Sequence, residues 1–277
     1  MVYFFINIYS EVIIIIKLLA LDIDGTITND SGNISNEIIT SIELVKSYKT
    51  KVCLVTGRRD IDITSIHNLC EKVDYLILNN GAKIVDINNK VILKNISIDV
   101  DDAKLLINYC LNNNILLYVT AKDFLGVNII TSGAIEYANS LNFNLIHYSN
   151  LDEIPLNNID GFMINNDGEK AIEFIKYKHL QFSYFRSEDN CIDIIPSNCD
   201  KWSSIEIVLR FLGIDPLEII SMGNHANDIE MINKSGIGIA VANAIDELKN
   251  AANYVTKSNN NQNPVKEVFE KFIIPKE

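Results

Sequence analysis

Short apolar runs alternate with amphipathic segments near the start of the chain. Residues 18–21 form an unbroken apolar run that ends at Asp22, as expected of a strand buried on both faces of a sheet. Similar runs follow, separated by segments in which apolar residues recur at helical spacing. Strands separated by helices predict right-handed crossovers and a parallel sheet. The predicted strands are 18–21, 52–55 and 75–78, and the predicted helices are 35–48, capped by Ser35, and 61–70.

The same alternation returns near the end of the chain, whereas the middle follows a looser order. There, a hairpin pattern around Asn88-Asn89 precedes mixed helix and strand runs. We therefore predict an α/β fold in which residues 1–82 and 197–277 form a Rossmann-like parallel sheet core and residues 83–196 form an inserted α+β domain. The late predicted elements are strands at 219–222 and 237–241 and helices at 202–212, 228–234 and 244–251.

Composition limits the partners that this chain is expected to have. Of its 277 residues 48% are hydrophobic, enough to bury a sizeable core, and the formal net charge is -12. Such an acidic chain repels nucleic acids and anionic lipids, so we expect neither as a partner. Five scattered cysteines without metal-site spacing indicate a reducing, cytoplasmic location. We expect a monomer or a homodimer that binds a small molecule.

The N-terminal segment raises the question of membrane targeting. Residues 1–20 are strongly apolar, but Asn7, Ser10, Glu11 and Lys17 interrupt them. A membrane anchor needs about 20 largely uninterrupted apolar residues, and a secretory signal begins with basic ones. We therefore expect an additional strand or arm beside the first core strand rather than a membrane segment.

Two acidic residues follow the first predicted strand, in the sequence Leu21-Asp22-Ile23-Asp24-Gly25-Thr26. Open α/β sheets bind ligands at the carboxyl ends of their strands, and Gly25 permits a sharp turn there. Two neighbouring carboxylates repel each other unless a cation or a proton lies between them. Because oxygen ligands of this kind suit Mg²⁺, Asp22 and Asp24 are predicted to bind Mg²⁺ and a phosphate ester. The alternative, an acidic surface turn, does not explain why both acids end a buried strand.

Three motifs occur in order along the chain: Asp-x-Asp-Gly-Thr after the first strand, Val-Thr-Gly-Arg after the second, and a late Gly-x-x-x-Asn-Asp. Together they resemble the haloacid dehalogenase-like hydrolases. The element order, the sequence Asn79-Asn80-Gly81-Ala82 and the run 227–231 are similar to the Cof-type branch, which carries a type IIB cap. The resemblance spans residues 17–272 and implies a phosphatase whose inserted domain is the cap.

The resemblance implies a role for each acid of the first motif. Asp22 would attack the phosphorus atom and form an aspartyl-phosphate, which splits the displacement into two steps. Asp24 would protonate the leaving oxygen, later activate water, and offer its backbone carbonyl to Mg²⁺. The metal would neutralise charge on the transferring phosphoryl group. Asp22 and Asp24 are therefore both predicted as catalytic residues and as metal ligands.

Thr56 and Gly57 end the second strand, where a hydroxyl and a backbone N–H can hold phosphate oxygens. On residue type alone, Thr56 is also consistent with a helix N-cap. Lys201, at the start of a predicted helix, matches the family's third motif, a lysine that neutralises the phosphate and the nucleophile. The family has Ser-Lys-Gly where this chain has Asp200-Lys201-Trp202, which leaves an exposed, solvated lysine as the alternative.

The fourth motif departs from the family pattern. Family members have Gly-Asp-x-x-Asn-Asp, whereas this chain has Gly223-Asn224-His225-Ala226-Asn227-Asp228. Asn224 replaces an anionic metal ligand with a neutral amide oxygen, so we expect weaker Mg²⁺ binding. Asp228 is predicted to act on the metal through water. His225 has no ligand spacing to the other histidines and is expected to face solvent.

The predicted function is hydrolysis of a small phosphorylated metabolite, such as a sugar phosphate. The cap would close over the core, exclude bulk water and select the substrate. One alternative is a phosphate-ligand-binding or regulatory protein whose catalysis is weakened at Asn224. A phosphomutase is a second alternative, ranked lower because such relatives carry other cap types. The predicted substrate contacts are Gly25, Gly57, Arg58, Asn80 and Asn227.

Overall fold

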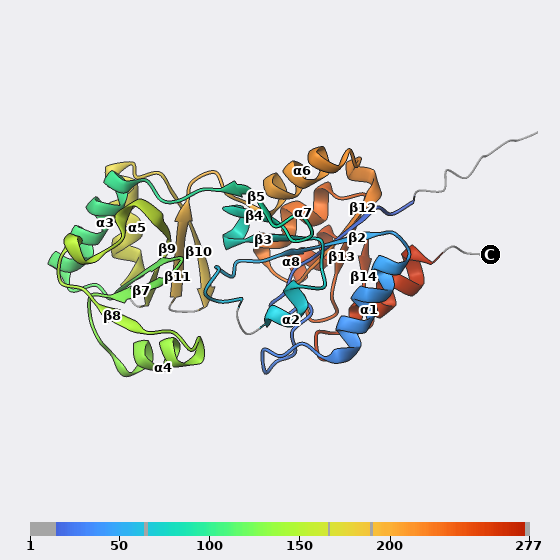
Figure 1. Cartoon of the computed structure of the whole chain (residues 1–277), viewed down its shortest axis with the longest axis horizontal. Helices are drawn as coiled ribbons and strands as arrows, with labels where there is room; N and C mark the ends of the chain where they lie inside the picture. The colour runs from blue at the N-terminus through green and yellow to red at the C-terminus, as the bar shows by residue number, and fades with distance from the viewer. Residues whose placement is uncertain (1–14, 64–65, 166, 189–190, 275–277) are drawn as a thin grey trace, which may run out of the picture.

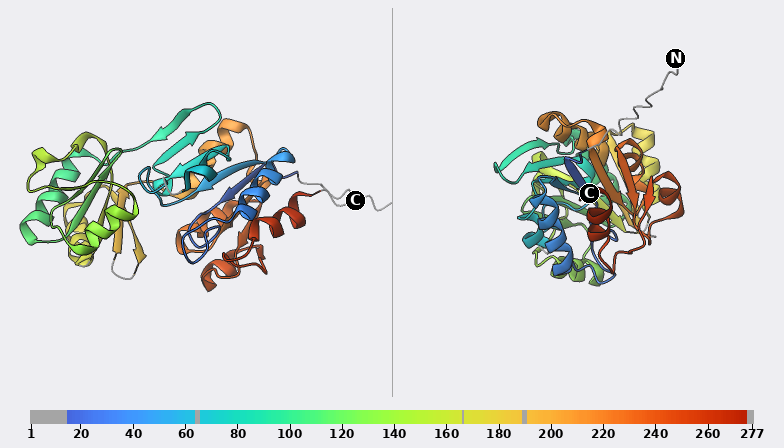
Figure 2. Two further views of the ribbon diagram at one scale, coloured as in Figure 1. Left: turned by 60° about the horizontal axis from the view of Figure 1, so that its bottom comes forward. Right: turned by 90° about the vertical axis from the view of Figure 1, so that its right-hand side faces the viewer.

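The computed structural model describes residues 15–63, 66–165, 167–188 and 191–274. They form two bodies, each built on its own sheet (Figure 1). A second view shows the two bodies lying end to end (Figure 2). The first 14 residues of the predicted N-terminal arm lie outside the described residues. Within the described ranges, no helix is both long and apolar enough to cross a membrane.

The first body is the α/β core, whose eight-stranded sheet has the order β14-β13-β12-β1-β2-β3-β4-β5. The six strands from β14 to β3 run parallel. The chain moves in opposite directions on the two sides of β1. Because crossovers between parallel strands are right-handed as a rule, this order places α1 and α7 on opposite faces of the sheet. The core elements are β1 (Leu18–Leu21), α1 (Asn36–Ser47), β2 (Lys51–Val55), α2 (His67–Cys70), β3 (Tyr75–Leu78), β4 (Lys83–Asp86), β5 (Val91–Asn95), α6 (Lys201–Leu212), β12 (Ile219–Gly223), α7 (Ile229–Lys234), β13 (Ile237–Ala240), α8 (Asp246–Ala251), β14 (Tyr254–Val255), α9 (Pro264–Val268) and the π-helix Phe269–Ile273.

The apolar runs of the sequence are the buried strands of this sheet. Every residue of β1 and β3 is buried, because helices cover both faces of the parallel part. The predicted cap of α1 is also confirmed, since Ser35 Oγ accepts a hydrogen bond from the backbone N–H of Ile38 at 3.3 Å. The parallel α/β core predicted from the sequence is thus confirmed.

The hairpin that was predicted within the inserted domain belongs to the core sheet instead. β4 pairs antiparallel with β3, and β5 pairs antiparallel with β4. Ile84 is fully buried in the core cluster, and this burial favours the pairing with β3. The predicted boundary at residue 83 is therefore wrong, and the insert begins after Asn95.

The helix predicted at 61–70 is shorter than expected. α2 covers only His67–Cys70, and Asp60–Ile63 forms turns. Ile61 does not occupy a helix face of the core, because it packs into a cluster of the second body with Tyr118 and Leu125. Ile61 is spaced from the later apolar residues as on one face of a helix, which explains the prediction. The residues that it contacts, however, lie in the second body.

The second body is the cap, an α+β unit whose six-stranded sheet has the order β10-β11-β9-β6-β7-β8. Leu117 and Ile164 pack with residues of α3 and α5, whereas the neighbouring residues Tyr118 and Met163 line a cavity on the other face. One face of the cap sheet is therefore turned toward the core. The cap elements are α3 (Val100–Asn113), β6 (Leu117–Ala121), β7 (Phe124–Val127), α4 (Ser132–Ser140), β8 (Leu145–His147), β9 (Ile159–Asn165), α5 (Gly168–Lys178), β10 (Phe182–Glu188) and β11 (Cys191–Pro196). Short 3₁₀ turns cover Asn79–Gly81, Leu151–Glu153, Leu156–Asn158, Pro216–Glu218 and Ala226–Asp228.

Gly81 lies where the core meets the second link to the cap. Its φ is +99°, and a Cβ there would lie 2.2 Å from the backbone carbonyl oxygen of Asp200. Ser204 Oγ also donates a hydrogen bond to the Gly81 carbonyl at 2.7 Å. The start of α6 is therefore packed directly against the backbone of residue 81.

We expect Gly81→Ala to lower the free energy of unfolding by roughly 3 kcal/mol, through strain at positive φ together with the clash. Gly32→Ala is the matched control, because Gly32 has φ +76° and a Cβ there would meet nothing within 4 Å. We expect the control to cost about 1 kcal/mol. Urea unfolding of both variants measures the difference. Equal losses would show that the start of α6 shifts freely.

Candidate active site

The first turn of α6 meets the carboxyl ends of β1 and β12 in a buried cluster of charges. Lys201 Nζ donates to Asp22 Oδ1 at 2.7 Å and to Asp228 Oδ1 at 2.6 Å. All three side chains are almost inaccessible to water. An exposed lysine, the alternative considered from the sequence, is therefore excluded. The Lys201 ammonium supplies the hydrogen bonds and positive charge that the two buried carboxylates would otherwise need from water.

The surroundings of Asp22 oppose its charged form. Burial and the Asp228 carboxylate raise the pKa of Asp22 to about 7, although Lys201 and Thr26 act in the opposite direction. Burial lowers the pKa of Lys201, but the two carboxylates raise it overall, so the lysine stays charged. One ammonium thus faces two acids. Because one negative charge is left without a positive partner, the surroundings of Asp22 favour binding of a cation or of an electrophile.

Thr26 contacts Asp22, although it was not among the predicted site residues. Its Oγ1 donates to Asp22 Oδ2 at 2.7 Å, so each oxygen of the carboxylate has a partner. The signal was present, because Thr26 is the last residue of the Asp-x-Asp-Gly-Thr motif. A threonine in this position fixes the orientation of the carboxylate.

Asp200 explains how α6 tolerates a lysine in its first turn. Asp200 is the N-cap, and its Oδ1 accepts from the backbone N–H of Ser203 at 2.7 Å. The carboxylates of Asp22 and Asp228 compensate for the unfavourable position of Lys201 near the positive end of the helix dipole. Although this chain has Asp200-Lys201-Trp202 in place of Ser-Lys-Gly, it thus retains both a helix-capping residue and the lysine.

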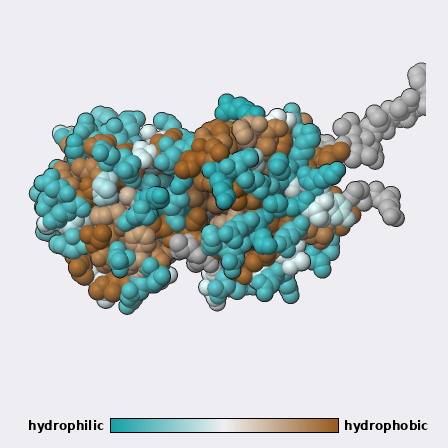
Figure 3. Space-filling model, viewed as in Figure 1, coloured by the Kyte–Doolittle hydropathy of each residue, from teal (hydrophilic) through white to brown (hydrophobic). Residues whose placement is uncertain are grey.

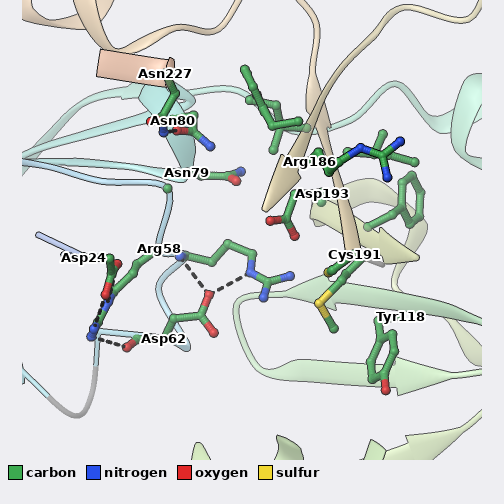
Figure 4. A pocket seen from close by; sticks show the side chains of 18 of the residues that line it. Asp24, Arg58, Asp62, Asn79, Asn80, Tyr118, Arg186, Cys191, Asp193 and Asn227 are labelled. Carbon is green, nitrogen blue, oxygen red and sulfur yellow. Dashed lines mark hydrogen bonds and ion pairs between the residues drawn. The ribbon is translucent and has the colours of Figure 1, made fainter. Parts of the chain in front are cut away.

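Asp24 has a different partner from Asp22. Its carboxylate is 57% exposed and accepts from Arg58 Nε at 3.0 Å and Nη2 at 2.7 Å (Figure 4). Such a two-point contact orients both groups. Arg58 was predicted to contact substrate, and here its guanidinium holds the side chain of Asp24.

The loop after β2 and the turn after β3 come together beside these acids. Thr56 is buried, and its Oγ1 accepts from the backbone N–H of Arg58 at 3.0 Å, so it stabilises a tight turn rather than a helix. Asn80 Oδ1 accepts from Asn227 Nδ2 at 3.1 Å. A Cβ on Gly57 would lie 3.1 Å from Asn80 Nδ2. The predicted contacts Gly57, Asn80 and Asn227 therefore form one surface.

A cavity of about 1250 Å³ lies between the core and the cap. On the face shown in Figure 3, apolar side chains gather among polar ones at the junction of the two bodies. The cavity joins the acids and the asparagine surface to aromatic and charged groups of the cap sheet. Its lining includes Asp22, Asp24, Arg58, Asn80, Asn224, His225 and Asn227 from the core, and Tyr118, Tyr137, Met163, Phe185, Arg186 and Asp193 from the cap.

The comparison with known families agrees with this geometry. The model of the haloacid dehalogenase-like hydrolase family matches residues 19–269. The chain belongs to the haloacid dehalogenase-like hydrolases. The predicted family is confirmed, and so is the prediction of a hydrolytic enzyme at the level of that family.

Relatives of this hydrolase match nearly their whole length. YxeH of Bacillus subtilis, which is named as a phosphatase, is 28% identical over 256 residues, covering 88% of this chain and 94% of YxeH. A haloacid dehalogenase-like hydrolase from Bacteroides thetaiotaomicron has a TM-score of 0.83 at 23% identity, covering 92% and 99% of the two chains. A subclass IIB sugar phosphatase has a TM-score of 0.77 at 22% identity, covering 93% and 100%. The predicted fold, including the type IIB cap, is confirmed.

Asn224 occupies the position at which family members are expected to carry an acid. Among the described residues, no group of three or more His, Cys, Asp or Glu side chains is placed to hold a metal ion. Asn224 Oδ1 nevertheless lies 3.2 Å from Thr26 Oγ1, the hydroxyl that also contacts Asp22 Oδ2. Two acceptor oxygens, from Asp22 and Asn224, thus flank one hydroxyl, and oxygens of this kind suit a Mg²⁺ ion that keeps several waters.

Both carboxylate oxygens of Asp228 accept hydrogen bonds, and those of Oδ2 hold the loop after β12. Its Oδ1 accepts from Lys201, and its Oδ2 accepts from the backbone N–H groups of Asn224 at 2.9 Å and His225 at 3.0 Å. His225 itself is exposed, as predicted. The contacts of Asp228 therefore position Asn224 beside Asp22.

We expect Asn224→Asp to strengthen Mg²⁺ binding about tenfold. A carboxylate adds one negative charge beside Asp22, worth on the order of 1–4 kcal/mol at the effective dielectric of a cleft. Repulsion from Asp22 and desolvation remove part of that gain, and tenfold corresponds to about 1.4 kcal/mol. Calorimetric titration with Mg²⁺, together with the Mg²⁺ concentration for half-maximal activity, measures the change.

Asn227→Asp is the matched control, because it adds the same charge to the same loop at a residue that contacts Asn80. We expect it to leave Mg²⁺ affinity within about twofold of the wild type. Identical titrations for Asn224→Asp and the wild type would show that residue 224 does not face the metal.

Proposed function

We propose that this hydrolase is a Mg²⁺-dependent phosphatase of a small phosphorylated metabolite and that it reacts through an aspartyl-phosphate on Asp22. The observation that carries the proposal is the buried Asp22 carboxylate, held by Lys201 and Thr26 at the floor of the cavity between core and cap. A carboxylate fixed in this way is oriented for attack on a phosphorus atom before substrate arrives.

Two proton transfers through Asp24 complete the reaction. An oxygen of Asp22 forms a bond to phosphorus while the bond to the leaving oxygen breaks, and Asp24, which enters this step carrying a proton, gives that proton to the leaving oxygen. Asp24 then takes a proton from water, whose oxygen attacks phosphorus and breaks the bond to Asp22. The products are an alcohol and inorganic phosphate, and both acids return to their starting state.

Three further groups support the transferring phosphoryl oxygens. Thr56 Oγ1 accepts the Arg58 N–H, and a hydroxyl that accepts can still donate its own hydrogen to a phosphate oxygen. The backbone N–H of Gly57 follows directly on the loop. Lys201 balances charge on Asp22 and on the phosphate together.

Asp22, Asn224 and the backbone carbonyl of Asp24 are the groups proposed to hold Mg²⁺. When bound, the ion supplies positive charge that offsets the negative charge of the phosphoryl group. Because Asn224 is neutral, the proposal includes weaker metal binding than an aspartate would give. A cytoplasmic location belongs to the proposal, since scattered free thiols suit a reducing compartment.

The cavity favours a substrate of metabolite size. Its volume of about 1250 Å³ admits a phosphate together with a sugar-sized group, and the cap sheet supplies Tyr118, Asp193 and Arg186 to contact that group. The shared fold with a subclass IIB sugar phosphatase supports the same class of substrate. The neutral Asn224 favours one competing function, a phosphate-binding regulator with little turnover.

We expect Asp22→Asn to reduce turnover of p-nitrophenyl phosphate by at least about a thousandfold, because the nucleophile is lost while the shape of the side chain is kept. Asp246→Asn removes an exposed charge on α8 and should retain wild-type activity. Acid-quenched wild-type protein should carry a phosphoryl group on the Asp22 peptide by mass spectrometry. Turnover that survives Asp22→Asn would refute the nucleophile, and an inactive wild type would favour the regulator.

A further inference from the structure

The loop after β2 carries two adjacent arginines that reach different parts of the cavity. Arg58 holds Asp24, as described above. The neighbouring Arg59 is buried and reaches the cap, where Nη1 donates to Thr120 Oγ1 at 3.3 Å and Nη2 donates to Tyr137 Oη at 2.5 Å. Thr120 lies on β6 and Tyr137 on α4. A core arginine is thus anchored in two elements of the cap.

Asp62 joins the two arginines and the cap. Its Oδ2 accepts from the Arg59 backbone N–H at 3.0 Å and from Arg59 Nε at 2.8 Å. Its backbone carbonyl accepts from Arg58 Nη1 at 3.4 Å, and Tyr137 Oη donates to its Oδ1 at 3.1 Å. Figure 4 shows Asp62 between the side chains of Asp24 and Arg58 and the cap sheet. One short turn therefore contacts both the catalytic acid's partner and the cap.

The ion pair between Arg59 and Asp62 lies wholly within the core, so it stays intact when the cap moves. Arg59 and Asp62 both belong to the core, and the cap contributes the hydroxyls of Thr120 and Tyr137. Against the effect of burial, the cap carboxylate of Asp193 adds to the effect of Asp62 in raising the pKa of Arg59. Separating a buried ion pair is strongly unfavourable, whereas water replaces a neutral hydroxyl partner at small cost. The hydrogen bonds of Arg59 to the two cap hydroxyls are therefore suited to forming when the cap closes and breaking when it opens.

We propose that Arg59 is a positioning residue that makes the placement of Asp24 depend on the closed cap. With the cap closed, Thr120 and Tyr137 fix Arg59, the turn through Asp62 is held, and Arg58 keeps the Asp24 carboxylate in one place. With the cap open, the turn loses both hydroxyl anchors, and Asp24 loses that support. The inference rests on the proposed function, in which Asp24 gives a proton to the leaving oxygen.

The dependence of rate on the leaving group separates this role from simple cap attachment. Poor leaving groups need a proton from Asp24, whereas good ones depart as anions without it. A series of aryl phosphates of similar size and different leaving-group pKa therefore reports on proton transfer from Asp24. The measured quantity is the slope of log kcat/KM against the leaving-group pKa. Asp24→Asn, which cannot give the proton, sets the steepest slope.

We expect Arg59→Lys and Tyr137→Phe to steepen this dependence toward that of Asp24→Asn, slowing the poorest leaving group roughly tenfold more than the best. Tenfold is a fraction of the about 10²–10⁴ that positioned proton transfer contributes. Tyr109→Phe is the matched cap control, because its hydroxyl contacts the Lys170 carbonyl and its ring stacks on Phe174. Arg210→Lys on α6 is the matched core control. Both controls should keep the wild-type dependence.

Two results would overturn the proposal, and they distinguish its failure from that of the proposed function. Wild-type slopes in both Arg59→Lys and Tyr137→Phe, with only lower melting temperatures, would show that Arg59 merely holds the cap. If Arg59→Lys does not fold, Tyr137→Phe decides alone, because it keeps the ring and removes one hydroxyl. A wild-type protein that hydrolyses no aryl phosphate would refute the proposed function and this inference with it.

Discussion

The buried contact of Lys201 with Asp22 and Asp228 is the interaction on which the site depends. Lys201, at the start of α6, lies 179 residues from Asp22, which follows β1, and 27 residues from Asp228, which ends the turn after β12. Removing Lys201 would leave two buried carboxylates without a positive partner, which is strongly unfavourable. The ion pairs therefore fix where α6 begins, and α6 begins directly after the chain returns from the cap.

Because α6 is fixed, the second link between cap and core is fixed as well. Asp200 caps the helix, and its carbonyl lies so close to Gly81 that a side chain there would clash. The first link follows β5, whose hairpin is paired into the core sheet. Both ends of the cap insertion are thus tied to the same edge of the core that holds Asp22, and the cavity forms at that edge.

Much of the core and of the candidate site could be predicted because their signals are local. An apolar run that ends in Asp22 marks both a buried strand and the ligand-binding edge of a parallel sheet. The cap boundary could not be predicted, because the pattern around Ile84 is the same whether the hairpin pairs with β3 or with the cap. The anchoring of Arg59 in the cap was equally invisible, since Tyr137 lies 78 residues away and only the tertiary fold brings the two together.

The neutral Asn224 is best understood as part of the charge balance rather than as an isolated loss. Asp22 and Asp228 already share a single ammonium, and burial raises the pKa of Asp22 to about 7. A third carboxylate next to Thr26 would increase that repulsion in the absence of a cation and favour the fold only when a cation is bound. With Asn224 the loop keeps an oxygen donor beside Asp22 without the added charge, so the arrangement of the site depends less on the metal that it is proposed to bind.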